Sequence, residues 1–259
     1  MDSSIISCVK AEKVKKSLGF VLQGLNHLLW PAVCLNCRQS ISERNDGLCS
    51  SCWDELLECT GGDYCPRCGR DAGIYAMVEG ACPACQGKKI YFDGIARSGV
   101  YVDAVREMIL SFKKGKTELD STLGFLADSA LQGSGFLENV DLFVPVPLHW
   151  LRRLSRGYNQ SLIIVKKLKN AKGKISTDLV RIRNTQSQIS MISPAARARN
   201  VAGAFAVRRD HSFEGKNICL VDDIKTTGAT LNECAKTLKR AGASKVYALV
   251  LAVAGQNIE

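Results

Sequence analysis

The sequence predicts an α/β protein in which a parallel sheet carries helices on both faces, with a small cysteine-rich domain ahead of it. Strand-length apolar runs alternate with helix-like runs over residues 91–259, a pattern typical of parallel sheets. Four CxxC pairs precede that region, within residues 31–90. Residues 1–30 are expected to form an amphipathic extension, so the sequence predicts three segments in all.

The extension over residues 1–30 carries apolar side chains at helical spacing between Leu18 and Leu29, which would give one apolar helix face. Lysines before this run imitate a secretory signal, but Gln23 and Asn26 interrupt it and no small-residue cleavage site follows. The run is also too short to cross a bilayer. We therefore predict a docking helix, rather than a membrane-bound or partner-binding one, and no transmembrane segment.

The cysteines of the second segment have the spacing of metal ligands. A CxxC turn places two thiolates on one face of a tight knuckle, and two such knuckles complete a zinc tetrahedron. Knuckles that are neighbours in sequence pair at the lowest loop-closure cost. The sequence therefore predicts a double zinc ribbon whose first site is formed by Cys34, Cys37, Cys49 and Cys52 and whose second site is formed by Cys65, Cys68, Cys82 and Cys85.

Disulfides and redox chemistry are the alternatives for these cysteines. Disulfides need an oxidising compartment, and without a convincing secretory signal we expect a reducing cytoplasm. Thioredoxin-type chemistry is disfavoured because no CxxC pair opens a helix after a strand. Because four thiolates leave no open coordination position, one or two structural zinc ions are expected rather than a catalytic one.

The third segment, residues 91–259, supplies the expected elements of the sheet. Tyr91–Tyr101, which contains Gly94 and Gly99, predicts two short strands. Further strands are expected over Asp141–Leu148, Asp178–Ile182, Ala204–Val207, Ile218–Val221 and Lys245–Ala254. Helices are expected over Ala104–Phe112, Leu119–Leu131, Ser161–Lys169 and Leu231–Arg240. The run that ends at Leu148 contains two prolines, which donate no ladder hydrogen bond and so should close that strand.

The strongest functional signal lies in Asn217–Thr230. An apolar strand is expected to end at Asp222 and Asp223, after which a threonine-glycine loop leads into a helix. Free backbone N–H groups and the positive end of the helix dipole make such a turn an anion site. Gly228 would let the backbone approach the anion closely. Because the carboxylates would repel a phosphate, we expect them to face sugar hydroxyls, a divalent cation or both.

A nucleoside-triphosphate loop is excluded by its spacing. The chain contains one GKT sequence, Gly115-Lys116-Thr117. Leu110 stands five residues before Gly115, where that motif requires a glycine.

The run Val221–Thr230, VDDIKTTGAT, closely resembles the phosphoribosyl pyrophosphate motif of type I phosphoribosyltransferases. The resemblance implies a type I phosphoribosyltransferase-like sheet. It also implies that Asp222 and Asp223 bind the ribose as the catalytic acidic pair, with magnesium bound together with phosphoribosyl pyrophosphate. It assigns the 5-phosphate to a loop formed by Thr226, Thr227, Gly228, Ala229 and Thr230.

Further motifs narrow the resemblance to the ComF family. They are VPVPLH at Val144–His149, RGYNQ at Arg156–Gln160, the stretch Arg183–Phe205 and the cysteine-rich segment. ComF proteins join a zinc ribbon to a phosphoribosyltransferase-like domain and are associated with DNA uptake during natural competence. By position, the resemblance implies that Pro145–His149 forms the pyrophosphate-side loop, with Val146 and Pro147 as its binding residues, and that Thr185–Asn200 is a mobile loop. Lys114 departs from the family pattern, which has an aromatic residue there.

The chemistry of pyrophosphate displacement sets two requirements. Positive charge builds on the ribose ring, and negative charge builds on the leaving group. The acidic pair with magnesium would meet the first requirement. Arginines would meet the second, and the candidates are Arg152, Arg153, Arg197 and Arg199, of which Arg197 is our choice for phosphoribosyl pyrophosphate binding.

Three functions stay open from the sequence. The first is a competence-type protein that binds phosphoribosyl pyrophosphate or a nucleotide, contacts competence machinery and handles single-stranded DNA. The net charge of +10 favours such polyanionic partners. The second is an active phosphoribosyltransferase whose acceptor is an unnamed base or amine. The third is a fold that has lost catalysis and acts as a protein-interaction module.

Overall fold

We analysed a computed structural model, which describes residues 32–41, 47–185, 193–209 and 211–254. The chain divides into two compact units, residues 1–53 and 54–259. The extension predicted over residues 1–30 lies outside the described residues, and the predicted domain bounds stay a prediction. Over the described ranges, none of the helices is both long enough and apolar enough to span a membrane.

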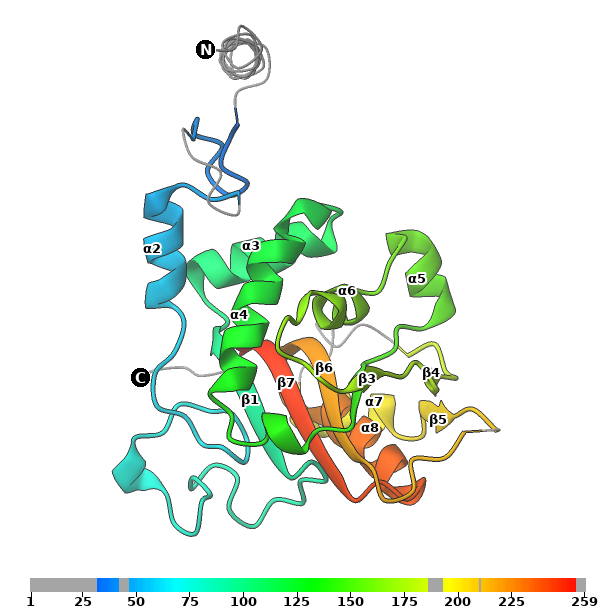
Figure 1. Cartoon of the computed structure of the whole chain (residues 1–259). Coiled ribbons are helices and arrows are strands. Elements are labelled where there is room, and N and C mark those ends of the chain that lie inside the picture. Colours follow the sequence, from blue (N-terminus) through cyan, green and yellow to red (C-terminus); the bar gives the residue numbers. More distant parts are fainter. Residues whose placement is uncertain (1–31, 42–46, 186–192, 210, 255–259) are drawn as a thin grey trace, which may run out of the picture. The chain divides into compact units, whose positions relative to one another are not determined.

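The elements follow one another along the chain as labelled in Figure 1. The α-helices are α2 (Ser50–Glu58), α3 (Asp103–Lys113), α4 (Asp120–Gln132), α5 (Trp150–Arg156), α6 (Gln160–Lys167), α7 (Pro194–Val201) and α8 (Ala229–Arg240). The strands are β1 (Gly94–Val100), β2 (Leu142–Pro145), β3 (Lys174–Ile175), β4 (Leu179–Arg181), β5 (Phe205–Val207), β6 (Asn217–Lys225) and β7 (Lys245–Val253). Short 3₁₀ turns are η1 (Ile74–Ala76), η2 (Thr117–Leu119) and η3 (Leu137–Asn139).

Five strands form one parallel sheet in the order β1-β7-β6-β2-β3. The central strand β6 pairs with β7 from Asn217↔Lys245 to Lys225↔Val253. This arrangement confirms the parallel sheet that the alternation of apolar runs predicted. It also places the end of β6, with its acidic pair, in the middle of the sheet.

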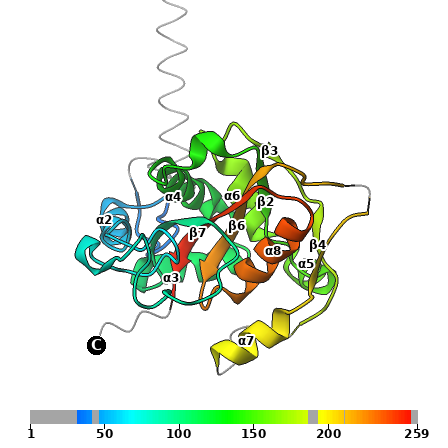
Figure 2. The same ribbon diagram turned by 90° about the horizontal axis from the view of Figure 1, so that it is seen from below.

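Helices cover both faces of this sheet, as predicted. Helices α4 and α6 pack on one face, and α8 packs on the other, as Figure 2 shows. On the α8 side, Leu220 of β6 and Val250 of β7 share a core with Leu231 and Cys234 of α8. All four side chains are fully or almost fully buried, because strand residues alternate between faces and α8 presents one apolar stripe.

The structure differs from the sequence prediction in several elements. Tyr91–Tyr101 forms one strand, β1, rather than two, because its glycines lie within a regular ladder with β7. Strands β4 and β5 pair antiparallel with each other and stand apart from the parallel sheet. Helices α2, α5 and α7 and strand β3 were not predicted. Strand β6 continues to Lys225 and does not stop before the acidic pair.

Gly99 of β1 allows a close approach of the segment that precedes the second cysteine group. Thr60 forms an antiparallel bridge with Gly99, and the carbonyl oxygen of Cys59 accepts a 3.1 Å hydrogen bond from Val100. A Cβ atom on Gly99 would overlap the Cys59 carbonyl. The absence of a side chain therefore holds residues 59 and 60 against the edge of the sheet.

We expect Gly99→Ala to lower the free energy of unfolding by roughly 1 to 3 kcal/mol, because the added methyl group must displace backbone. Urea denaturation of the full chain measures this change. Gly133→Ala is the matched control, because its Cβ would lie 3.8 Å from the nearest atom at an ordinary φ of −74°. Equal stabilities of the two variants would contradict the packing argument.

Candidate functional site

The end of β6 projects beyond its neighbour β2. Pairing with β2 stops at Pro145↔Val221, while pairing with β7 continues four residues further, to Lys225↔Val253. The last bond on the β2 side runs from the amide of Val146 to the carbonyl of Val221, at 2.9 Å. Because Pro145 and Pro147 donate no ladder bond, β2 ends here. Among the described residues, Asp222 and Asp223 therefore have no strand partner on the β2 side.

Asp222 is held by two donors. The hydroxyl of Ser161 on α6 donates to its Oδ1 at 3.2 Å, and the amide of Asp223 donates to the same oxygen at 2.9 Å. Burial, followed by the neighbouring Asp223 charge, raises the pKa of Asp222 to about 7, against the lowering effect of Lys113 and of the two donors. Asp222 is thus poised to gain or lose a proton near neutral pH.

Asp223 pairs with a lysine that the sequence analysis missed. The ammonium of Lys113, the last residue of α3, lies 2.9 Å from Oδ2 of Asp223, and both side chains are mostly buried. The pair is distant in sequence, and a lysine at a helix end is ordinary by composition. No local signal therefore marked it. Lys113 supplies the positive charge that allows two adjacent carboxylates to share this place.

The RGYNQ motif holds in place the elements that surround the acidic pair. Gly157 ends α5 with a left-handed φ of +83°. The Tyr158 hydroxyl donates to the carbonyl of Phe112, next to Lys113. Asn159 caps α6 at the amide of Ser161 and donates at 3.1 Å to the carbonyl of Val146. The motif thus holds Lys113, Ser161 and the loop after β2 around the acidic pair.

The loop after β6 has the geometry of an anion cradle. Gly228 adopts φ +81° directly before α8, a conformation that favours glycine, and the amide of Ala229 donates to the Thr227 hydroxyl at 3.3 Å. The first amides of α8 lack intrahelical acceptors by the geometry of any helix start. A small cavity of about 20 Å³ is lined by Asp222, Ile224, Lys225 and the loop residues Thr226–Leu231. All five residues predicted for the phosphate loop therefore lie in one cavity wall with Asp222.

The other predicted contacts are placed as follows. Val146 is buried and its amide is already bonded to Val221, while Pro147 has no amide hydrogen. Neither residue can donate a backbone N–H group to a ligand. Arg197 lies on α7, a helix that packs against α8. The central part of the predicted mobile loop, residues 186–192, lies outside the described residues.

Arg152 and Arg153 differ in their surroundings. Arg152 is partly buried and its guanidinium donates to the carbonyl of Thr185 at 2.7 Å. Burial, followed by the nearby Arg156 charge, lowers the pKa of Arg152. Arg153 is exposed on α5. Arg152 therefore has a structural contact at the start of the predicted mobile loop, and Arg153 presents its charge to solvent.

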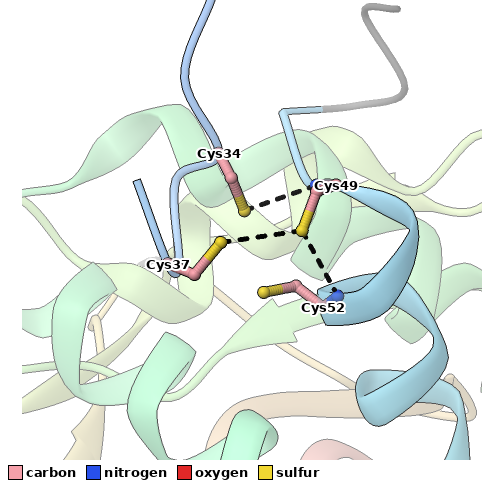
Figure 3. A group of neighbouring side chains, drawn as sticks. All are labelled: Cys34, Cys37, Cys49 and Cys52. Carbon is pink, nitrogen blue, oxygen red and sulfur yellow. Dashed lines mark hydrogen bonds between the residues drawn. The ribbon is translucent and has the colours of Figure 1, made fainter. Parts of the chain in front are cut away.

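The eight paired cysteines gather into two groups, as predicted: Cys34, Cys37, Cys49 and Cys52, and Cys65, Cys68, Cys82 and Cys85. In the first group, shown in Figure 3, the sulfur of Cys37 lies 3.6 Å from that of Cys49. The amide of Cys49 donates to the sulfur of Cys34 at 3.3 Å. Within each group the ligand atoms lie within 4.8 Å of one another.

All four cysteines of the second group are buried. Its sulfur atoms lie 3.5 Å apart for Cys68 and Cys82 and 3.7 Å apart for Cys65 and Cys85, too far for disulfides. Burial raises the pKa of the Cys65 thiol, but amide hydrogen bonds from Cys82, Cys68 and Arg67 outweigh it and bring the pKa to about 7. Such amides favour the thiolate form that a metal binds. Both donor sets therefore fit structural zinc.

Comparison with known proteins finds relatives of both parts of the chain. The family described as the double zinc ribbon domain matches residues 25–87, and the family described as the phosphoribosyl transferase domain matches residues 154–258. The DNA utilization protein YhgH of Escherichia coli (strain K12) is 30% identical over 223 residues, covering 83% of this chain and 94% of that protein. The chain belongs to the ComF family.

Competence protein F of Haemophilus influenzae is a further relative of this ComF-family chain. It is 28% identical over 226 residues, covering 85% of this chain and 96% of that protein. A hypoxanthine phosphoribosyltransferase from Staphylococcus aureus superposes with a TM-score of 0.34 at 14% identity, over 58% of this chain and 76% of that one, which is too loose to carry an argument. Membership of the ComF family confirms the predicted combination of a double zinc ribbon and a phosphoribosyltransferase-type sheet.

The raised pKa of Asp222 predicts that the stability of this ComF-family protein depends on pH. This pKa is raised from 3.8 to about 7 by folding, so between these values the folded chain holds more protons than the unfolded chain. The stability contributed by Asp222 therefore falls as the pH rises from about 4 to about 7. Because an asparagine side chain cannot ionise, we expect Asp222→Asn to raise the free energy of unfolding at pH 8 by on the order of a few kcal/mol, and by less at pH 5.

Denaturant unfolding of the wild type and of Asp222→Asn at pH 5 and pH 8 measures this effect. Glu138→Gln is the control, because Glu138 is a largely exposed carboxylate in an ion pair with Lys172. A stability difference for Asp222→Asn that is the same at both pH values would show that Asp222 stays ionised throughout this range.

Proposed function

We propose that this ComF-family protein binds phosphoribosyl pyrophosphate, or a nucleotide with the same ribose 5-phosphate part, at the carboxyl end of β6. The observation that supports this most directly is the shared cavity wall of Asp222 and the loop that begins α8. A phosphate at the loop would meet backbone amides and the positive end of α8. The attached ribose would reach back to the acidic pair, where carboxylates accept hydrogen bonds from its hydroxyls.

Magnesium fits the same proposal through charge. The acidic pair is balanced by Lys113 at Asp223 and by protonation at Asp222, whose pKa is about 7. A divalent cation carried by the pyrophosphate would favour the ionised form of Asp222. Cationic contacts to the pyrophosphate would then come from Arg197 and from Lys113, if ligand binding releases Lys113 from Asp223. Val146 and Pro147 would contribute packing contacts, because neither can donate an amide hydrogen.

Calorimetric titration of the zinc-loaded protein with phosphoribosyl pyrophosphate and magnesium tests the proposal. We expect binding by the wild type and a loss of roughly 100-fold or more in affinity for the double variant Asp222→Asn, Asp223→Asn, because the ribose and metal contacts are charge-assisted. Glu138→Gln should bind like the wild type, since it removes an exposed carboxylate elsewhere. No heat and no thermal shift with the wild type would overturn the proposal and favour a protein-interaction module.

Catalysis by the same site is the second candidate function. The pairing of two carboxylates with Lys113 offers both charges that pyrophosphate displacement requires. Release of pyrophosphate that depends on an added base or amine would support an active phosphoribosyltransferase. Binding without such release would leave a ligand-binding protein.

We also propose that α5 contributes to the handling of single-stranded DNA. Trp150 is 60% exposed and Leu154 is 73% exposed on this short helix, and Arg153 is exposed beside them. An exposed aromatic ring next to basic side chains suits base stacking with phosphate neutralisation. Relatives named for competence and DNA utilization, and the net charge of +10, support the same class of partner.

We expect Trp150→Ala together with Arg153→Glu to weaken binding of single-stranded DNA by about tenfold or more for every sequence alike. Fluorescence anisotropy with labelled oligonucleotides at fixed salt measures the affinity. Lys172→Glu is the control for the charge reversal, because Lys172 is 84% exposed and lies in another part of the fold. Equal losses for both variants would indicate only the general effect of net charge.

A further inference from the structure

Lys225, the last residue of β6, lies between the phosphate loop and the second cysteine group. Its side chain is 5% exposed, which is rare for a lysine without an anionic partner. A Cβ on Gly228 would lie 3.0 Å from Cε of Lys225, so the lysine stem packs against the loop at its glycine. Lys225 also lines a cavity of about 190 Å³ together with Cys68 and Cys85 of the cysteine group and Thr227 and Gly228 of the loop.

The charges of the second cysteine group and of Lys225 complement each other. Four thiolates around Zn²⁺ carry a net charge of about −2, which needs positive charge nearby when it is buried. Burial lowers the pKa of Lys225, and the nearby sulfur atoms of Cys68, Cys85 and Cys65 oppose that lowering because negative charge on them favours the ammonium form. The repulsive contribution comes from Arg70, which lines the same cavity. A metal ion with its thiolates in this group would therefore supply the net negative charge that a buried lysine needs.

The segment that carries the second cysteine group packs against the same sheet that carries the loop. The amide of Ile95 in β1 donates to the carbonyl of Pro66 at 2.9 Å, and a Cβ on Gly69 would touch Ile95 and Val253 at 3.2 to 3.3 Å. Val253 is in turn the β7 partner of Lys225. A shift of the cysteine group would therefore reach the end of β6 through direct packing.

A second link joins the ribbon's end to α8. The side chain of Asn232, one turn into α8, accepts a 2.6 Å hydrogen bond from the amide of Tyr91 and donates at 3.3 Å to the carbonyl of Lys89. These residues follow directly after the second cysteine group. The phosphate loop is thus linked to the cysteine segment at both ends. Lys225 makes the link before the loop, and Asn232 makes it in the helix after the loop.

We propose that the second zinc site is a structural part of the phosphate loop, with Lys225 as the positioning residue between them. The metal group holds the ammonium, and the lysine stem supports the loop at Gly228. We assign this role to the second site alone, because the first site belongs to the separate unit formed by residues 1–53. The consequence for ligand affinity rests on the proposed function, whereas the coupling between zinc and loop does not.

Hydrogen–deuterium exchange of the full-length chain tests the coupling without any ligand. Removing the second zinc with a chelator, in the background Cys34→Ser, Cys37→Ser, should speed exchange of the amides in residues 222–232 by about tenfold or more. The same background with its second zinc in place should match the wild type there. Unchanged exchange in residues 222–232 after loss of the second zinc would overturn the proposal.

Lys225→Met tests the positioning residue, with Lys216→Met as its matched control. Lys216 is exposed directly before the opposite end of β6. In the background above, Lys225→Met should release zinc to a chromogenic chelator about tenfold faster, as expected when a residue that supports a metal group is lost. Lys216→Met should leave the rate unchanged. Equal rates for the two variants would show that Lys225 does not support the metal group.

Reciprocity provides a third readout. If the loop and the zinc site are coupled, phosphoribosyl pyrophosphate with magnesium should raise the equilibrium affinity for zinc, measured by competition with a chelator, by the same factor by which zinc strengthens ligand binding, about fivefold or more. Ligand binding without any change in zinc affinity would argue against the coupling while leaving the proposed function intact. A wild type that binds no ligand but passes the exchange and release tests would support the coupling and refute the proposed function.

Discussion

Two adjacent carboxylates at the end of a buried strand repel each other and resist burial, and much of the surrounding structure offsets that repulsion. Asp223 pairs with Lys113, while Asp222 accepts hydrogen bonds from Ser161 and from a backbone amide. Each of these groups comes from a different element. The acidic pair therefore requires α3, α6 and β6 to meet at one point, and that meeting point is the candidate ligand site.

The strand β2 contributes to the site by ending early. Its prolines stop the ladder at Pro145, and the acidic pair of β6 lies just beyond that last rung. Asn159 then ties the loop after β2 to the start of α6. The RGYNQ motif therefore has a structural role. It fixes α3, α6 and the loop after β2 around the acidic pair.

The two cysteine groups share a chemistry but differ in their surroundings. Each offers four sulfur ligands at distances that suit one zinc ion. The second group is fully buried and packs on β1 through Pro66 and Gly69, in the compact unit that also contains the sheet. Zinc bound there would stabilise an edge of the sheet as well as the cysteine segment, because hydrogen bonds and packing join the two.

Local signals in the sequence determined the metal groups, the parallel sheet and the strand-loop-helix turn of the acidic pair. CxxC knuckles, apolar runs and a glycine at a helix start are properties of short stretches, so they can be recognised without the fold. Tertiary structure alone decided the partners of the acidic pair and the burial of Lys225. Lys113 lies 110 residues before Asp223 in the sequence, and Lys225 is separated from Cys85 by a similarly long stretch. Such contacts depend on which strands become neighbours, and a single sequence carries no local signal for that choice.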